Sequence, residues 1–309
     1  MTDTPVDLTA SETGRVLRDV LGPLVAQGAI VRRPRATAWA ERRQVDRTSR
    51  RVLERLRARY DGAPLVVRLG GRRLVLATRP EHVERILAGS PEPFTPASWE
   101  KRGALAHFQP DGVLISPLPE RLVRRPYNEA VLDMSEPVHR DGDAFVAAVE
   151  RETRALVATV EASGRLDWDT FAASWWRTVR TVVLGRAARD DERLVAILDA
   201  LRRDGNWSWF RPRRPWLRAA LERRIAEHVA VAEPGTLAAR GRDTGGADAV
   251  RRQIPHWLFA FDAAGAATFR ALAVAAARPA VRDRLLAEPA TAGDGPAVLP
   301  LARRHSSEP

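Results

Sequence analysis

The spacing of hydrophobic residues along the chain predicts a mainly helical protein. From about residue 120 onward, apolar residues recur every three to four positions, which is the period of an amphipathic α-helix. We expect helices over residues 41–60, 80–88, 120–133, 138–161, 168–185, 190–204, 215–232, 253–277 and 279–287. Prolines, glycines and polar residues separate them, so we expect an irregular arm over residues 1–35 and loops over residues 90–119, 204–215 and 233–247.

One segment departs from the helical period. Pro64–Thr78 reads PLVVRLGGRRLVLAT, in which two runs rich in aliphatic residues flank Gly70-Gly71. Paired glycines supply the positive φ angles of a tight two-residue turn. The segment is therefore predicted to form an N-terminal β-hairpin.

The longest apolar run extends from Trp257 to Ala277 and reads WLFAFDAAGAATFRALAVAAA. It is rich in alanine and carries Asp262 and Arg270, so we interpret it as a buried core helix rather than a membrane span. The first dozen residues include acidic side chains and no apolar stretch, which argues against a signal peptide. We expect a cytoplasmic protein with no membrane partner.

Composition excludes several kinds of chemistry. The chain has no cysteine, so it has no disulfide, thiolate zinc site, iron–sulfur cluster or thiolate nucleophile, and we expect no metal ligands. The net charge of +11 is typical of nucleic-acid-binding proteins. However, Lys101 is the single lysine, and arginine in place of lysine is what codon bias in a GC-rich genome produces. No arginine cluster is interleaved with aromatic residues, so we expect no nucleic-acid partner.

Four residues of the 257–277 run share one helix face, at spacings of i, i+4, i+7 and i+11: Phe261, Gly265, Thr268 and Leu272. Glycine within a helix costs about 1 kcal/mol relative to alanine and allows another group to come close to the backbone. A threonine hydroxyl can bond to the carbonyl one turn back. This pattern indicates either a small-molecule site or a close contact between helices.

This run resembles the oxygen-activating helix of the cytochrome P-450 family, the haem-thiolate monooxygenases. The family pattern Ala/Gly-Gly-x-Asp/Glu-Thr stands here as Ala264-Gly265-Ala266-Ala267-Thr268. The resemblance implies that Gly265 and Thr268 are catalytic and that Ala264 and Gly265 contact a haem (heme) cofactor. The acidic residue that delivers protons in the family is replaced by Ala267, and Asp262 lies on another side of the helix.

The resemblance extends to other segments of the chain. Pro64–Leu87 is similar to the family's hairpin and the helix after it, and Glu100–Ser116 to its substrate-lining loop. The resemblance therefore implies that His107, Phe108 and Phe261 contact substrate. Residues 119–133 resemble the helix that holds a haem propionate, which implies cofactor-binding roles for three arginines, Arg121, Arg124 and Arg125. Pro126 departs from the family pattern and puts the direction of Arg125 in doubt.

The fold expected from the resemblance is a P-450-like helical fold with a small N-terminal β-hairpin and without its C-terminal third. We expect an arm over residues 1–39, the N-terminal two-thirds of a P-450 domain over residues 40–304, and an unrelated tail over residues 305–309. The segment Leu299–Arg304 begins like another helix and stops within a turn. The family's Glu-x-x-Arg helix and its cysteine loop would lie beyond this point.

The function implied by the resemblance is haem- and O2-dependent oxidation of a hydrophobic small molecule, with electrons from a ferredoxin or flavin-type donor. Thiolate ligation of the iron favours O–O cleavage, and the chain has no cysteine. We therefore expect this chain to be catalytically incompetent. The alternatives are a non-catalytic helical binding module and, third, a basic nucleic-acid-binding protein.

Overall fold

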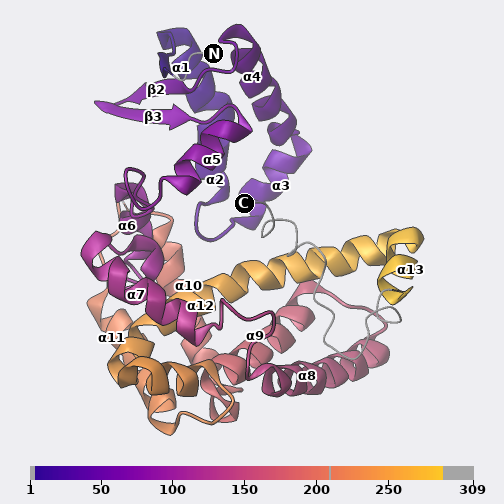
Figure 1. Cartoon of the computed structure of the whole chain (residues 1–309). Helices are drawn as coiled ribbons and strands as arrows, with labels where there is room; N and C mark the ends of the chain where they lie inside the picture. The colour runs from indigo at the N-terminus through magenta and orange to yellow at the C-terminus, as the bar shows by residue number, and fades with distance from the viewer. Residues whose placement is uncertain (1–3, 209, 288–309) are drawn as a thin grey trace. The chain divides into compact units, whose positions relative to one another are not determined.

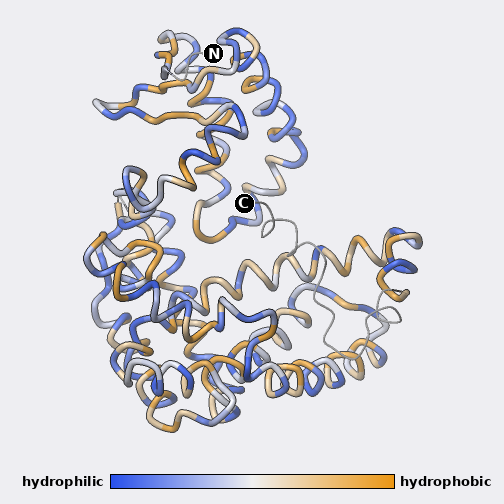
Figure 2. Tube along the Cα trace, in the orientation of Figure 1, coloured by the Kyte–Doolittle hydropathy of each residue, from blue (hydrophilic) through white to orange (hydrophobic). Residues whose placement is uncertain are grey.

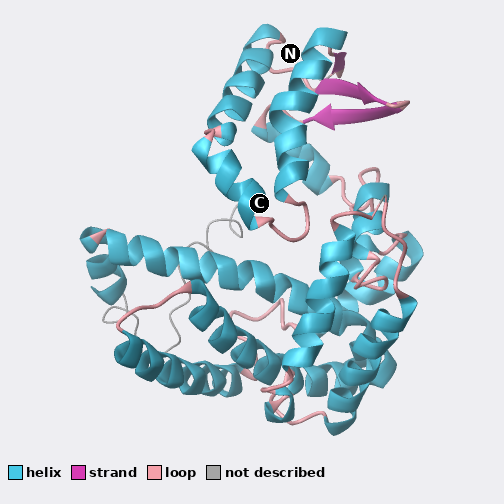
Figure 3. Cartoon of the chain, turned by 180° about the vertical axis from the view of Figure 1, so that it is seen from behind, coloured by secondary structure: helices cyan, strands magenta, loops and turns pink. Residues whose placement is uncertain are grey.

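The computed structural model describes residues 4–208 and 210–287 (Figure 1). The chain divides into two units, Met1–His107 with Ala200–Arg213, and Phe108–Asp199 with Arg214–Pro309. The described residues are mainly helical and include one small three-stranded sheet, as Figure 3 shows. The prediction of a mainly helical protein is therefore confirmed. The expected helix start at residues 299–304 and the expected tail at 305–309 lie outside the described residues.

The first unit combines short helices with the sheet. Its elements are β1 (Val6–Asp7), α1 (Ala10–Val16), the π-helix η1 (Leu17–Leu21), α2 (Gly22–Gln27), α3 (Pro34–Arg42), α4 (Val45–Arg59), β2 (Leu65–Leu69), β3 (Arg72–Leu76), α5 (Pro80–Ala88) and α6 (Trp99–Leu105). Its core joins the apolar face of α4 to β2, where Val52 and Leu56 pack with Leu65 and Val67.

The predicted hairpin is confirmed. β2 and β3 pair antiparallel with Leu69 opposite Arg72, which leaves Gly70 and Gly71 as the two turn residues. Both glycines have positive φ, 51° and 77°, as a two-residue turn of this kind requires. The short strand β1 adds in parallel on the other side of β2.

The expectation of an irregular arm over residues 1–35 is wrong. Thr9 caps α1, and the side chain of Glu12 returns a hydrogen bond to the backbone of Thr9, so the two residues form a capping box. Pro23 follows the π-helix η1 without a break in the helical backbone, because Leu21 and Gly22 both have right-handed helical conformations. The expected helix over residues 41–60 is also interrupted, because Gln44 adopts a left-handed conformation between α3 and α4. The expected loop over residues 90–119 contains α6 and the short 3-10 helix η2.

The second unit is helical throughout its described elements. They are η2 (Val113–Ile115), α7 (Leu118–Val131), α8 (Gly142–Ser163), α9 (Trp168–Leu184), the 3-10 helix η3 (Arg186–Ala188), α11 (Pro215–Val231), α12 (Leu237–Ala277) and α13 (Pro279–Ala287). The remaining helix, α10 (Glu192–Gly205), belongs to the second unit as far as Asp199 and to the first from Ala200. α12 packs against α7, α9 and α11.

The long helix α12 begins earlier than the sequence pattern predicts. The hydroxyl of Thr236 accepts a hydrogen bond from the backbone of Ala239, so the helix starts at Leu237 inside the expected 233–247 loop. Gly246, with φ of 83°, interrupts the helical conformation and bends the chain. Pro255 lies farther along the same helix.

The expectation that the 257–277 run is a buried core helix is also wrong. An 18-residue window of α12 has a mean hydropathy of 1.4, but only 11% of that window is buried. Figure 2 shows the apolar character of this helix, which is drawn at the yellow end of the colour bar in Figure 1. By length and composition the helix is able to cross a membrane, a test that core helices of soluble proteins also pass.

Candidate functional site

A buried amide joins α7 to α12. Asn128 accepts a hydrogen bond at Oδ1 from the indole Nε1 of Trp257, at 2.7 Å, and its Nδ2 donates to Oε1 of Gln253 at 3.2 Å. All three side chains are buried. Because a buried polar group left unpaired costs about 1–3 kcal/mol, these bonds favour one register of α7 against α12.

Residues 108–112 are tied to the same part of α12. The fully buried side chain of Gln109 accepts a hydrogen bond at Oε1 from Nδ1 of His256, at 2.9 Å. Gln253 donates from Nε2 to the carbonyl of Asp111, also at 2.9 Å. Burial lowers the pKa of His256 below its usual value of 6.5, because it disfavours the charged ring.

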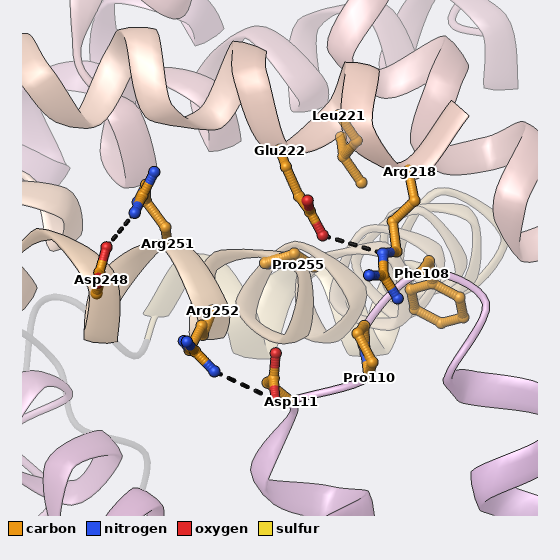
Figure 4. A pocket seen from close by; sticks show the side chains of 10 residues that line it. All are labelled: Phe108, Pro110, Asp111, Arg218, Leu221, Glu222, Asp248, Arg251, Arg252 and Pro255. Carbon is orange, nitrogen blue, oxygen red and sulfur yellow. Dashed lines mark hydrogen bonds and ion pairs between the residues drawn. The ribbon is translucent and has the colours of Figure 1, made fainter. Parts of the chain in front are cut away.

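A pocket of about 360 Å³ lies between residues 108–111, α11 and α12 (Figure 4). Three buried apolar side chains, Phe108, Leu221 and Pro255, line its interior. Its volume lies in the lower part of the range of about 300–1,000 Å³ that small-molecule sites occupy.

The rim of the pocket carries equal numbers of arginines and carboxylates. They form three ion pairs: Arg218–Glu222, Arg251–Asp248 and Arg252–Asp111. Each pair is partly exposed, so each contributes at most about 1 kcal/mol to stability. These pairs therefore add little to the stability of the fold, and they place hydrogen-bonding groups around the apolar interior of the pocket.

Asp111 is the most firmly held of these carboxylates. Nη2 of Arg124 donates to Oδ1 of Asp111 at 2.7 Å, and Nη1 of the same arginine donates to Oγ of Ser116 at 2.9 Å. Two guanidinium bonds from one side chain fix its orientation. In the structure Arg124, for which the resemblance implies contact with a haem propionate, bonds to a carboxylate in the wall of the pocket.

Pro255 breaks the hydrogen-bond ladder of α12 next to the pocket. Proline has no N–H, so the carbonyl of Arg251, four residues earlier, receives no hydrogen bond from position 255. Both Arg251 and Pro255 line the pocket.

The second half of α12 carries the predicted catalytic residues, and its glycine is covered by protein. Gly265 is buried, and a Cβ placed on it would lie 2.6 Å from the indole Nε1 of Trp175 on α9. That Nε1 donates to the carbonyl of Phe261 at 3.0 Å. The group that comes close to the backbone at Gly265 is therefore the indole of Trp175. This agrees with a close contact between helices, the second of the two alternatives indicated by the sequence pattern.

Thr268 forms the bond that its position predicts. Its hydroxyl donates to the carbonyl of Ala264 at 3.0 Å, one turn back, and both residues are exposed. Leu272 is also exposed, at 44%. The face defined by the sequence is thus divided between a packed part at Gly265 and an exposed part at Thr268 and Leu272.

The pocket and the Thr268 region lie on different parts of α12. Thirteen residues separate Pro255 from Thr268, which corresponds to about 20 Å along an α-helix. The structure therefore does not bring the predicted catalytic residues to the lining of the pocket.

The other two predicted cofactor-binding arginines bond to nearby protein groups. Nη1 of Arg121 donates to the carbonyl of Val113 at 2.8 Å, and burial lowers the pKa of the Arg121 guanidinium. Arg125 donates from Nε to Glu129 at 2.7 Å and is exposed.

The three residues predicted to contact substrate do not share one site. His107 is buried, at 4% exposed. Phe108 lines the pocket and packs against Phe259, with ring centroids 5.3 Å apart. Phe261 is half-buried, and its backbone is bonded to Trp175 on α9.

No family model, curated protein or solved structure matches this chain. The P-450 resemblance therefore stays a prediction from the sequence pattern.

The described residues do not fit a haem at the Gly265 face. The indole of Trp175 occupies the space next to Gly265. Arg121, Arg124 and Arg125 each donate to a protein group, and the sequence contains no cysteine to supply a thiolate. We derive no chemical step through a haem.

Sequence reasoning missed most of the residues that form the pocket and its support. Gln253 and His256 are polar residues within an otherwise apolar helix stripe, which was an available signal for a buried polar network. Pro255 within a helical pattern was a second signal. The contribution of α11 had no signal, because its residues are more than 100 positions from Phe108 in the sequence.

Proposed function

We propose that this chain is a non-catalytic helical binding protein for a small organic molecule. The observation that carries the proposal is the pocket between residues 108–111, α11 and α12, where a buried apolar interior is surrounded by three ion pairs. Small-molecule sites combine an apolar lining with a few convergent polar groups in this way.

The charge balance of the rim selects the class of ligand. Three arginines and three carboxylates line the pocket, so neither an anion nor a cation is favoured by the net field. A molecule with an apolar ring and a zwitterionic group can pair with both partners of one ion pair while its ring covers Phe108 and Leu221. We infer that ligands of this class bind best.

The test compares ligands that share one ring and differ in charge. Tryptophan, indole-3-propionate and tryptamine are titrated by calorimetry into the native protein. They are also titrated into a variant that exchanges the rim pair, Arg218→Glu with Glu222→Arg. That exchange keeps an i,i+4 ion pair on α11 and reverses its polarity. The matched control exchanges an exposed arginine and an exposed glutamate at the same spacing on α11, Arg223→Glu with Glu227→Arg.

We expect the zwitterion to bind the native protein and the control exchange with similar affinity, and to bind the rim exchange about tenfold more weakly. Equal affinity for all three proteins would contradict the proposal, as would the absence of saturable binding by any of the three ligands.

The P-450-like scaffold implied by the sequence pattern is less well supported, because the indole of Trp175 occupies the space next to Gly265. Titration with haem, followed by reduction and addition of carbon monoxide, tests it. We expect no saturable haem spectrum, and no red-shifted band of the thiolate type, because no residue in the sequence supplies the sulfur. Saturable haem binding would contradict this expectation.

A further inference from the structure

The first unit contains a second pocket, of about 700 Å³, whose lining is rich in arginine. It lies between the start of α3 and the end of α10 with the connection that follows it. Its lining includes Arg32, Arg33, Arg35, Arg203 and Arg211. No described lining residue carries a carboxylate.

The two segments that form this pocket are joined by one amide side chain. Asn206 accepts hydrogen bonds at Oδ1 from the backbone N–H groups of Ile30 and Val31, at 2.8 and 3.1 Å. Its Nδ2 donates to the carbonyl of Val31 at 2.7 Å. Three bonds from one side chain fix the chain before α3 against the chain after α10, so the pocket walls are preorganised.

The positive charge in this pocket is largely uncompensated. Arg211 pairs with Asp204 at 3.0 Å. Among the described residues, Arg32, Arg33, Arg35 and Arg203 form no ion pair. Like charges at close range repel one another, and a bound anion relieves that repulsion.

Arg33 is held in place with part of its guanidinium unused. It lies 4.2 Å from the ring centroid of Trp207, and its Nη1 donates to the carbonyl of Ala26 at 3.1 Å. Its Nη2 is buried and has no hydrogen-bond partner among the described residues. A buried donor without a partner is costly, and a ligand oxygen would satisfy it.

The start of α3 adds backbone donors to the same pocket. Arg33, the N-cap residue, makes no side-chain capping bond, and Pro34 occupies the first helical position. The N–H groups of Arg35 and Ala36, which line the pocket, therefore have no partner within the helix. Helix N-termini favour anions through these free donors and the helix dipole.

We propose that this pocket binds a small molecule that carries a di- or triphosphate group. Guanidinium groups match phosphate oxygens in two-pronged hydrogen bonds. The arginines surround one pocket of small-molecule size, which favours a compact polyphosphate over a nucleic-acid strand. Trp207 is 44% exposed and gives a nucleotide an aromatic edge next to the phosphates. This pocket belongs to the first unit, whereas the pocket lined by Phe108 and Pro255 belongs to the second, so each proposal can be tested independently of the other.

The experiment measures binding of tripolyphosphate, ATP, adenosine and a 20-nucleotide single-stranded DNA by calorimetry. The pocket variant is Arg35→Gln with Arg203→Gln, which removes two exposed charges without breaking an ion pair. The matched control, Arg47→Gln with Arg51→Gln, removes two exposed charges from α4. Circular dichroism checks that both variants keep the native helical content.

We expect ATP and tripolyphosphate to bind the native protein and the control, and to bind the pocket variant at least about tenfold more weakly. Adenosine should not bind at the same concentrations. Equal weakening in both variants would overturn the proposal, because it would show attraction to net charge alone. DNA that binds more tightly than ATP and loses affinity in the pocket variant would also overturn it, in favour of a nucleic-acid site.

Discussion

Replacement of Gly265 by alanine tests whether this glycine serves helix packing. In the structure a Cβ at this position would lie 2.6 Å from Nε1 of Trp175 and 2.9 Å from two further indole atoms. Contacts this short are not tolerated, so the indole has to move. Its hydrogen bond to the carbonyl of Phe261, at 3.0 Å, is then weakened or lost.

The expected free energy change follows from three contributions. Overpacking of a close contact costs about 1–3 kcal/mol, and loss of the indole hydrogen bond costs about 1 kcal/mol. Alanine regains about 1 kcal/mol relative to glycine within a helix. We therefore expect Gly265→Ala to lower the free energy of unfolding by about 1–3 kcal/mol.

A double-mutant cycle with Trp175→Ala makes this prediction specific. Without the indole there is no steric conflict, so Gly265→Ala should stabilise the Trp175→Ala protein by up to about 1 kcal/mol. The assay is urea unfolding followed by circular dichroism at 222 nm for the four proteins. If Gly265→Ala has the same effect with and without Trp175, the packing explanation is wrong.

Three further predictions concern buried polar groups in the second unit. Asn128→Ala leaves the indole N–H of Trp257 unpaired, and we expect urea unfolding to show a loss of about 1–3 kcal/mol for each buried group left without a partner. The pKa of His256 is lower in the folded protein than in the unfolded chain, so on acidification the unfolded chain binds the proton first. Stability should therefore be full above pH 6.5 and fall as the pH drops below it. The variant His256→Gln should show a weaker dependence of the melting temperature on pH. Hydrogen bonds from Arg140 lower the pKa of Asp133 to about 2, against the usual 3.8 of an aspartate, so stability from this pair should be present above about pH 4 and lost as the pH falls through 2. An Asp133→Asn protein with the same acid profile would contradict this.

The elements that the sequence predicted well are those set by local physical chemistry. Gly70-Gly71 identified the hairpin turn because few residues adopt two consecutive positive φ angles. The apolar period after residue 118 identified α7, α9 and α11 to within a few residues, because each helix packs one face against the rest of its unit.

The errors near the N-terminus arose from local signals that were given the wrong weight. A proline predicts a helix break, but Pro34 lies in the first turn of α3, where proline is favoured. Pro23 follows η1 within a continuous helical backbone. The pattern Thr9-Ala10-Ser11-Glu12 is a capping box and was available in the sequence. In the same way, glycines suggested a loop over residues 233–247, but of these only Gly246 leaves the helical conformation in α12.

The pocket could not be predicted from the sequence because it depends on contacts between distant segments. Phe108 and Leu221 meet only once the second unit has folded. The arginines of the α7 segment were chosen by resemblance, whereas their partners are carbonyl and carboxylate groups that no local pattern identifies. The chain has 50 basic residues, so arginines occur in most of its helices. Their spacing in the α7 segment therefore does little to identify a cofactor site.

The sequence pattern placed Gly265 and Thr268 on one face of α12, but in the structure Gly265 is buried and Thr268 is exposed. Packing is concentrated at Gly265, where the absence of a side chain admits the indole of Trp175. Exposure is concentrated at Thr268 and Leu272, although Phe269 between them packs against Trp168 and Phe171 of α9. The pocket lies at a third place, around Pro255, where a proline within the helix removes one backbone donor. A site on this helix is therefore best sought where the ladder of hydrogen bonds is broken, and the Gly265 face is better explained by helix packing than by ligand binding.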